Sequence, residues 1–399
     1  MKACVIGLGE RGFGLITYVL LKNQDISIVS VCDQYEDRVA RAVDEIAKAG
    51  ERPQGFTDYR EALNVKGLEM VFIFTGWEMH TEIAVAAMKK GIPVASEVGC
   101  EYSLENCFNL VRTQEQTGTP YMFMENCCWG KEELLGTALA RNGLLGKLVH
   151  ASGTYAHDLR KEVAYGLQNR HYRFRNYQHR NCENYPTHEL GPIAKALDIN
   201  RGNRILTVSS VASKAAGLAD YIATCDDATD EMKNTTFRQG DIVTTMLTCA
   251  NGETVRLQLD TTLPRYYSRD FTLRGTKGMY LQDFNCVFLD GDEHVFDPAK
   301  HLNNSKPYEE KYLPECWKSV TQEMLEAGHG GMDWFAYKAF TDAVKNNTVM
   351  PIDVYDAATW MVVSVLSERS IAQSGAPQAM PDFTNGQWFH RPRLDVCEL

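Results

Sequence analysis

A short glycine pattern near the start of the chain places the strongest constraint on its fold. Gly7, Gly9 and Gly12 follow an apolar run, Lys2–Ile6. The next residues, Phe13–Leu21, have the apolar spacing of a helix. A strand, a glycine-rich turn and a helix in this order are typical of dinucleotide-binding domains. In such a turn, Gly7 would allow the tight bend, Gly9 the approach of a pyrophosphate, and Gly12 the close packing of helix and strand.

An acidic residue stands where this pattern requires one. A second apolar run, Ile26–Cys32, ends at Asp33, about 20 residues after Gly12, as in this fold. The Asp33 carboxylate can accept hydrogen bonds from both ribose hydroxyls and would repel a 2′-phosphate. We therefore predict NAD as the cofactor in preference to NADP. A glycine-rich turn in another kind of α/β protein is the alternative.

Apolar runs and helical patterns continue to alternate up to residue 127. The expected strands are Met70–Thr75, Pro93–Ser96 and Tyr121–Met124, and the expected helices are Thr81–Lys90 and Leu104–Thr117. Doubly wound parallel sheets bind ligands at the carboxyl ends of their strands. We therefore predict a Rossmann domain over residues 1–127. Its crevice should gather Arg11, Gly12, Asp33, Trp77, Glu78, Met79, His80, Glu97 and Asn126.

Residues 128–399 follow a different pattern, which predicts an α+β domain. After a helical stretch, Lys131–Asn142, come strand-like runs separated by turns such as Asn251-Gly252, and these indicate an open, mainly antiparallel sheet. The runs are Leu148–Tyr155, Ile205–Ala212, Asp241–Cys249, Thr254–Thr261, Asp270–Arg274, Gly278–Asp283 and Cys286–Leu289. Two helices, Met332–Asn346 and Val354–Ser374, are expected near the end. Two polar segments, 170–180 and 300–315, are expected to be loops.

Composition excludes several classes of function. The net charge of −11 disfavours binding to nucleic acid or to an anionic membrane surface, since both need a cationic footprint. No apolar stretch approaches the ~18–20 residues that span a bilayer, and no targeting segment opens the chain. The twelve cysteines form no C-x-x-C pair, so we expect reduced thiols and a cytoplasmic location. His157 and Asp158 together with His188 and Glu189 are a possible metal cluster, but their spacing is not a recognised zinc pattern, so we predict no metal.

The two-domain pattern resembles the Gfo/Idh/MocA oxidoreductases. Members of that family usually carry Glu-Lys-Pro after the fourth strand and Asp-x-x-x-His in the second domain. This chain has Glu97-Val98-Gly99 and Asn184-Tyr185-Pro186-Thr187-His188 in those places. The histidine is kept and the lysine, a proton carrier, is absent. This absence counts against an ordinary sugar or inositol dehydrogenase.

Several longer strings are similar to family 109 glycoside hydrolases, which are NAD-dependent α-N-acetylgalactosaminidases on the same fold. They are Trp77–His80, Ser96–Val98, Glu125–Trp129, Tyr155–Arg160, Tyr185–His188, Leu197–Gly202 and Gly330–Asp333. The resemblance implies NAD contacts from Arg11, Gly12, Asp33, Trp77, Glu78, Met79, His80, Glu97, Val98 and Asn126. It implies sugar contacts from Tyr155, Arg173, Tyr185, Pro186, Thr187, His188 and Tyr267. Two positions depart from the family: Gly99 replaces a usual proline, and Glu189 replaces a usual glycine.

The resemblance also implies a reaction in which tightly bound NAD is recycled. Hydride leaves C3 of the sugar, the C2 proton is removed, the C1 substituent departs, water adds at C1 and the hydride returns. His188 would carry protons, with Tyr155 and Tyr267 as partners. The alternatives are an NAD-dependent sugar or inositol dehydrogenase and a non-catalytic NAD-binding sensor. We further expect a small glycoside as the substrate and a homodimer or homotetramer.

Overall fold

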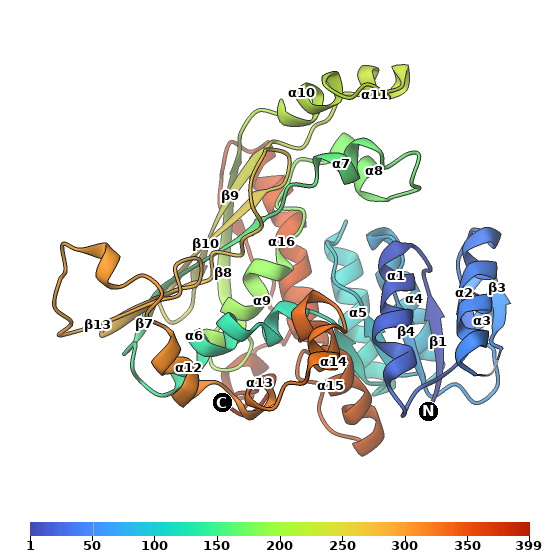
Figure 1. Ribbon diagram of the computed structural model, residues 1–399, viewed down its shortest axis with the longest axis horizontal. Coiled ribbons are helices and arrows are strands. Elements are labelled where there is room, and N and C mark those ends of the chain that lie inside the picture. Colours follow the sequence, from blue (N-terminus) through green and yellow to red (C-terminus); the bar gives the residue numbers. More distant parts are fainter. Residues whose placement is uncertain (51) are drawn as a thin grey trace. The chain divides into compact units, whose positions relative to one another are not determined.

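The computed structural model describes residues 1–50 and 52–399, which form two compact units (Figure 1). The first comprises Met1–Trp129 and Ser319–Ala358, and the second comprises Gly130–Lys318 and Thr359–Leu399. The first unit therefore includes a segment from late in the chain, which the sequence pattern did not indicate. The domain boundary expected at residue 127 stays a prediction.

The first unit contains the predicted parallel sheet. Six strands lie in the order β3-β2-β1-β4-β5-β6, so the direction of winding reverses beside β1. Their bounds are β1 (Lys2–Ile6), β2 (Ser27–Cys32), β3 (Gln54–Phe56), β4 (Met70–Ile73), β5 (Val94–Ser96) and β6 (Tyr121–Phe123). All four residues of β4 are buried, as expected of a parallel strand covered on both faces. The Rossmann prediction is confirmed.

Helices of the first unit follow the strands and include one from the late segment. They are α1 (Glu10–Tyr18), η1 (Leu20–Lys22), α2 (Glu36–Ala49), α3 (Tyr59–Ala62), α4 (Trp77–Lys89), α5 (Leu104–Thr117), η2 (Asn126–Trp129), α14 (Gln322–Leu325), η4 (His329–Gly331) and α15 (Met332–Asn346). Aromatic packing fixes α15 in this unit. The ring of Phe72 on β4 lies 5.8 Å from that of Tyr337 and 5.5 Å from that of Phe340.

The second unit contains an eight-stranded sheet in the order β13-β12-β11-β7-β10-β9-β8-β14. Within this sheet, β7 and β10 are the only described strands that pair in parallel. The bounds are β7 (Leu148–Ala156), β8 (Ile205–Ala212), β9 (Ile242–Cys249), β10 (Thr254–Asp260), β11 (Thr272–Gly275), β12 (Gly278–Leu281), β13 (Cys286–Leu289) and β14 (Gln378–Ala379). The expected mainly antiparallel sheet is confirmed.

Helices of the second unit include two in segments expected to be loops. The unit holds α6 (Lys131–Arg141), α7 (Arg160–Ala164), α8 (Arg173–His179), α9 (Thr187–Ala196), α10 (Gly217–Ala223), α11 (Asp230–Asn234), η3 (Pro298–Lys300), α12 (Lys306–Tyr312), α13 (Glu315–Lys318) and η5 (Gln387–Phe389). Helix α16 (Val354–Ala372) begins in the first unit and ends in the second. The loop predictions for 170–180 and 300–315 were wrong at α8 and α12. Helix α8 buries Phe174 and Tyr177, whereas α12 buries none of its residues and so has no apolar periodicity that could have predicted it. No helix in the described residues is both long and apolar enough to span a membrane.

Candidate functional site

The glycine loop after β1 has the close packing that its sequence predicts. Gly7 has φ +100°, and a Cβ there would lie 2.4 Å from the carbonyl carbon of Phe74. A Cβ on Gly12 would lie 2.1 Å from the carbonyl oxygen of Gly7. A Cβ on Gly9 would meet nothing nearer than Arg38, at 3.6 Å. The start of α1 therefore lies tight against the loop, and the open backbone at Gly9 fits the approach of a pyrophosphate to the first-turn N–H groups.

Asp33 lies at the end of β2 and is fixed to the same loop. Its Oδ2 accepts the N–H of Leu8 at 2.8 Å, and its Oδ1 accepts the N–H of Tyr35 at 3.1 Å. The Arg38 guanidinium is 3.8 Å from the carboxylate. A carboxylate held beside the glycine loop fits the ribose of a dinucleotide.

Arg11, in the first turn of α1, is held between two carboxylates of the first unit. Its two terminal nitrogens donate to the two oxygens of Asp333 at 2.7 and 2.9 Å, and one of them also donates to Glu97 at 3.1 Å. Asp333 is fully buried and accepts a further hydrogen bond from Asn126 at 2.7 Å. Burial opposes ionisation of Asp333, but Arg11 and the hydrogen bond with His329 outweigh it and hold its pKa well below the usual range. We call Arg11, Glu97, Asn126, His329 and Asp333 the Arg11 cluster.

Sequence reasoning quoted Asp333 in a family string but gave it no role. The sequence feature that could have indicated Asp333 is an acidic residue in the first turn of a helix, just after the pair Gly330-Gly331. From the next turn of α15, the Tyr337 hydroxyl donates to Glu97 at 2.8 Å, and burial raises the pKa of Tyr337. Residues of the late segment, Asp333 and Tyr337, thus hold three of the predicted NAD-binding side chains in place by hydrogen bonds. These are Arg11, Glu97 and Asn126.

Trp77 and His80, near the start of α4, are buried and lie close to Gly99, which follows β5. Trp77 begins α4, and His80 Nε2 lies 2.9 Å from the carbonyl oxygen of Thr75. Burial lowers the pKa of His80 to about 4, so its ring is neutral at neutral pH. A Cβ on Gly99 would lie 2.8 Å from the indole of Trp77. This close approach explains why glycine stands where the resemblance would place proline. Val98 is buried, and Glu78 and Met79 occupy the same first turn of α4.

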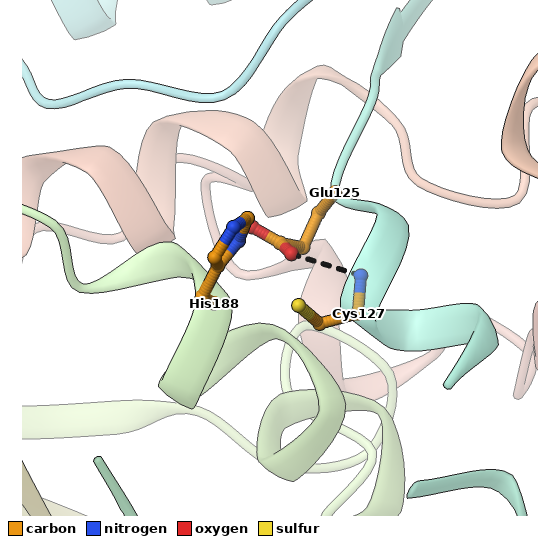
Figure 2. Close-up of side chains that lie close together, drawn as sticks. All are labelled: Glu125, Cys127 and His188. Atoms are coloured by element: carbon orange, nitrogen blue, oxygen red, sulfur yellow. Dashed lines mark hydrogen bonds between the residues drawn. The ribbon is translucent and has the colours of Figure 1, made fainter. Parts of the chain in front are cut away.

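Glu125 and Asn126 follow β6 at the entry to η2. The Glu125 carboxylate is buried and accepts the N–H of Cys127 at 3.1 Å (Figure 2). Asn126 is turned toward Asp333 by the hydrogen bond described above. The carboxyl end of β6 therefore carries two polar side chains that are fixed by hydrogen bonds, the Glu125 carboxylate and the Asn126 amide.

The second unit brings three predicted sugar-binding residues into ring contact. Tyr155 is on β7, Tyr185 precedes α9, and His188 is in the first turn of that helix (Figure 2 shows His188). The Tyr155 ring centroid lies 4.4 Å from that of Tyr185 and 5.4 Å from that of His188, and the last two are 4.7 Å apart. We call these residues the aromatic cluster. Burial raises the pKa of Tyr155 to about 12, so its hydroxyl keeps its proton at neutral pH.

Arg173 supplies the cation of this cluster. It begins α8, is buried, and its guanidinium carbon lies 4.8 Å from the ring centroid of Tyr185. Its Nε is 2.8 Å from the carboxylate of Glu162 on α7. An arginine fork fixed in this way can donate to hydroxyl or carbonyl oxygens.

A histidine, His157, lies between Tyr267 and Tyr155 of the aromatic cluster. The ring centroid of Tyr267 lies 5.2 Å from that of His157, whose Nδ1 is 3.4 Å from the Tyr155 hydroxyl. Burial and then Arg173 lower the pKa of His157. Tyr267 is 45% exposed. The sequence had indicated His157 only as a possible metal ligand and as part of the string Tyr155–Arg160, and its position between Tyr155 and Tyr267 was not predicted.

Pro186 and Thr187 place the N-terminus of α9 within the aromatic cluster. Pro186 is the N-cap and Thr187 the first helical residue, which puts His188 in the first turn, as expected. The Thr187 hydroxyl is buried and has no hydrogen-bond partner among the described residues. A neutral phenol, an imidazole, an arginine fork and an unsatisfied hydroxyl can together hold a polyhydroxyl ligand and move protons on it.

Two family models together match nearly the whole chain. The model described as "Oxidoreductase family, NAD-binding Rossmann fold" matches residues 1–124. The model described as "Glycosyl hydrolase 109, C-terminal domain" matches residues 129–390. The first unit is thus an NAD-binding Rossmann domain.

Named relatives agree with these matches. A glycosyl hydrolase family 109 protein from Stenotrophomonas maltophilia is 38% identical over 98% of this chain and 90% of its own length. An alpha-N-acetylgalactosaminidase from Tannerella forsythia is 37% identical over 97% of this chain and 86% of its own length.

Solved structures share the fold at low identity. Levoglucosan dehydrogenase, in complex with NADH and levoglucosan, has a TM-score of 0.69 at 16% identity and covers 96% of this chain and 100% of its own. The myo-inositol 2-dehydrogenase from Lactobacillus plantarum has a TM-score of 0.67 at 13% identity, covering 96% and 99%. By its sequence matches over both units, the chain belongs to glycosyl hydrolase family 109 and is a glycosidase.

Proposed function

We propose that this glycosidase cleaves α-N-acetylgalactosaminides or related hexosides and that it keeps and recycles one tightly bound NAD. The aromatic cluster carries the proposal, because it places His188, a residue able to transfer protons, in ring contact with Tyr155 and Tyr185, whose hydroxyls can bind sugar oxygens. Two relatives named alpha-N-acetylgalactosaminidase support the choice of sugar.

The nucleotide loop, Asp33 and the Arg11 cluster would hold the cofactor. Bound NAD supplies a hydride acceptor and donor, which allows transient oxidation at C3, loss of the C1 substituent after C2 deprotonation, and addition of water. The first-turn N–H groups of α1 would bind the pyrophosphate, and Asp33 would accept the ribose hydroxyls.

We assign the proton transfers at O3 and C2 to His188, with Tyr155 and Tyr267 as partners. The ring of His188 contacts that of Tyr155, and His157 contacts both Tyr155 and Tyr267. Tyr155 keeps its proton at neutral pH, so it would act as a hydrogen-bond donor to an oxygen of the sugar. Arg173, Tyr185, Pro186 and Thr187 would orient the ring.

The second candidate is an NAD-dependent sugar or inositol dehydrogenase. This candidate is favoured by the solved structures that share the fold, because several of them are dehydrogenases, including levoglucosan dehydrogenase and myo-inositol 2-dehydrogenase. Against it, Val98 stands where those oxidoreductases usually carry the proton-carrying lysine. A non-catalytic NAD sensor would have no need of the buried Arg173 or the aromatic cluster.

One assay separates the three candidates. The enzyme is incubated with p-nitrophenyl glycosides, including the α-N-acetylgalactosaminide, and in parallel with the free sugars, with and without added NAD⁺, and nitrophenol and NADH are followed together. The proposal predicts nitrophenol release without net NADH. A dehydrogenase would produce NADH from free sugars, and a sensor would produce neither signal.

A further inference from the structure

Two buried acidic residues lie at either end of the segment that carries Tyr185 and His188. Glu183 is 0% exposed and Glu189 is 1% exposed. No lysine, arginine or histidine forms an ion pair with either carboxyl in the part of the chain that the structure describes. Buried acids without a cation are rare, because the charged form is costly away from water.

The pair receives few hydrogen bonds from the surrounding protein. Oε2 of Glu189 accepts the N–H of Gln258 on β10 at 2.8 Å, while its Oε1 and both oxygens of Glu183 have no partner in the hydrogen-bond geometry of the described residues. Burial raises the pKa of Glu183 to about 8. Burial and then the nearby Glu183 carboxyl raise the pKa of Glu189 well above its usual range. At neutral pH the pair therefore keeps at least one proton.

The backbone around the pair fixes α9 against the sheet. A Cβ on Gly153 of β7 would lie 3.0 Å from the carbonyl oxygen of Glu189 and 3.1 Å from its Cβ, so helix and strand are in close contact. Gly153 and Tyr155 point to the same face of β7, since side chains alternate along a strand. At the other end, the N–H of Glu183 donates to the Ser367 hydroxyl on α16 at 2.8 Å.

Charged groups on the neighbouring elements already have partners. Asp260 on β10 pairs with Arg265 at 2.7 Å, and Glu368 on α16 pairs with Arg180 at 2.8 Å. Titratable groups near the segment include Tyr155 on β7, His188 on α9 and the Arg173–Glu162 pair on α8 and α7. The groups that act most strongly on the two carboxyls are each other and nearby backbone N–H groups, such as that of Gln258.

We propose that Glu183 and Glu189 are positioning residues, which together hold the segment between them against the sheet and so set Tyr185 and His188 in their places beside Tyr155. The inference rests on the proposed function of the aromatic cluster. Loss of the pair would move groups that must meet the sugar accurately, and a displacement of about 1 Å can cost about 10²-fold in rate.

The test compares Glu189→Ala, Glu189→Gln and Glu183→Gln with a surface control, Glu231→Gln on α11. Glu189→Ala should lower kcat by about 10- to 100-fold with a much smaller change in KM. Glu189→Gln should restore most of kcat, because its amide oxygen can still accept the Gln258 N–H. The wild-type enzyme should lose activity above a pH of about 8, and Glu183→Gln should lack this alkaline loss.

A titration that needs no substrate keeps this inference separate from the proposed function. In protein labelled with ¹³C at glutamate carboxyls, a resonance should titrate near pH 8 in the wild type and be missing in Glu183→Gln. The inference is overturned if every glutamate titrates in the ordinary acidic range, or if Glu189→Ala keeps wild-type kcat. If no glycoside is cleaved by the wild type, the proposed function fails, while the titration and the near-ultraviolet circular dichroism of Glu189→Ala still decide the positioning role.

Discussion

In the first unit, the buried carboxylate of Asp333 faces an arginine, whereas in the second unit the buried carboxyls of Glu183 and Glu189 face each other. The pKa of Asp333 is held low, and the pKa values of both glutamates are raised. Asp333 is therefore ionised at neutral pH. The glutamate pair changes its charge near pH 8.

This difference matches what each unit is proposed to do. A cofactor that is retained through every turnover needs a permanent scaffold, and an ion pair with good geometry supplies one. A site that moves protons needs neutral donors and acceptors whose arrangement is set by uncharged contacts. Variants of both units test this difference.

His188→Ala should have the largest effect, because it removes the proposed proton carrier of the aromatic cluster. We expect kcat to fall by about 10²- to 10⁴-fold. Bound NAD, measured by absorbance after denaturation, should stay unchanged. His390→Ala, an exposed histidine of the same unit, is the matched control. Wild-type turnover in His188→Ala would assign that histidine a structural role.

Asp333→Asn should lower the stability of the first unit, because Arg11 would lose its ion pair with Asp333 and keep the one with Glu97. We expect the free energy of unfolding to fall by about 2–3 kcal/mol, less than for a fully enclosed pair because Arg11 is partly exposed. Urea unfolding measures the change. Asp342→Asn removes an exposed pair with Lys338 on the same helix and should cost less than about 0.5 kcal/mol. Equal effects in the two variants would refute the scaffold role of Asp333.

Asp33→Ala should weaken NAD and relax the discrimination against NADP. The loss of a charged hydrogen-bond acceptor predicts a rise in the Kd for NAD of about 10-fold or more. Calorimetry with both cofactors checks the change, with Asp44→Asn on the exposed face of α2 as control. If the unaltered protein already binds NADP as well as NAD, the role assigned to Asp33 is wrong.

The pH dependence of stability should distinguish the two kinds of buried acid. Glu183 has a raised pKa in the folded state, so its contribution to stability is complete below its unfolded pKa and is lost as the pH rises toward about 8. Asp333 behaves in the opposite way, since its contribution is lost only as the pH falls through its lowered pKa.

The wild type should therefore lose stability relative to Glu183→Gln between about pH 5 and about pH 8, by at most about 1.4 kcal/mol per pH unit. Urea unfolding at several pH values measures this slope. A constant difference between the two proteins across the range would mean that Glu183 titrates in the ordinary acidic region.

Local patterns predicted the elements that carry much of the proposed site. Three features of the first unit are determined by short stretches of sequence, and the structure contains them as expected. They are the glycine turn, the position of Asp33 at the end of β2, and the buried strands β1 and β4. Strand β3 was not predicted, because it has three residues and a single apolar side chain, too few for a periodic signal.

The contacts between distant segments could not be predicted in the same way. Asp333 meets Arg11 only because the aromatic face of α15 packs on Phe72, more than half the chain away. The departure at Glu189 was visible in the sequence, but its partner Glu183 was not, since nothing in the local pattern indicates that both carboxyls turn inward. Segment 170–180 was expected to be a loop because of its basic and aromatic run, and α8 forms there because Phe174 and Tyr177 are buried.

The proposed reaction cleaves the glycosidic bond through transient oxidation at C3 and proton removal at C2. The most direct measurement is hydrolysis of the α-N-acetylgalactosaminide, or whichever glycoside is cleaved, in D₂O, with the released sugar analysed by mass spectrometry and proton NMR. The account predicts deuterium at C2, because the side chain that removes the C2 proton exchanges with solvent, and it predicts no deuterium from solvent at C3. Released sugar with ordinary hydrogen at C2 would contradict the account even if NAD proved essential for activity.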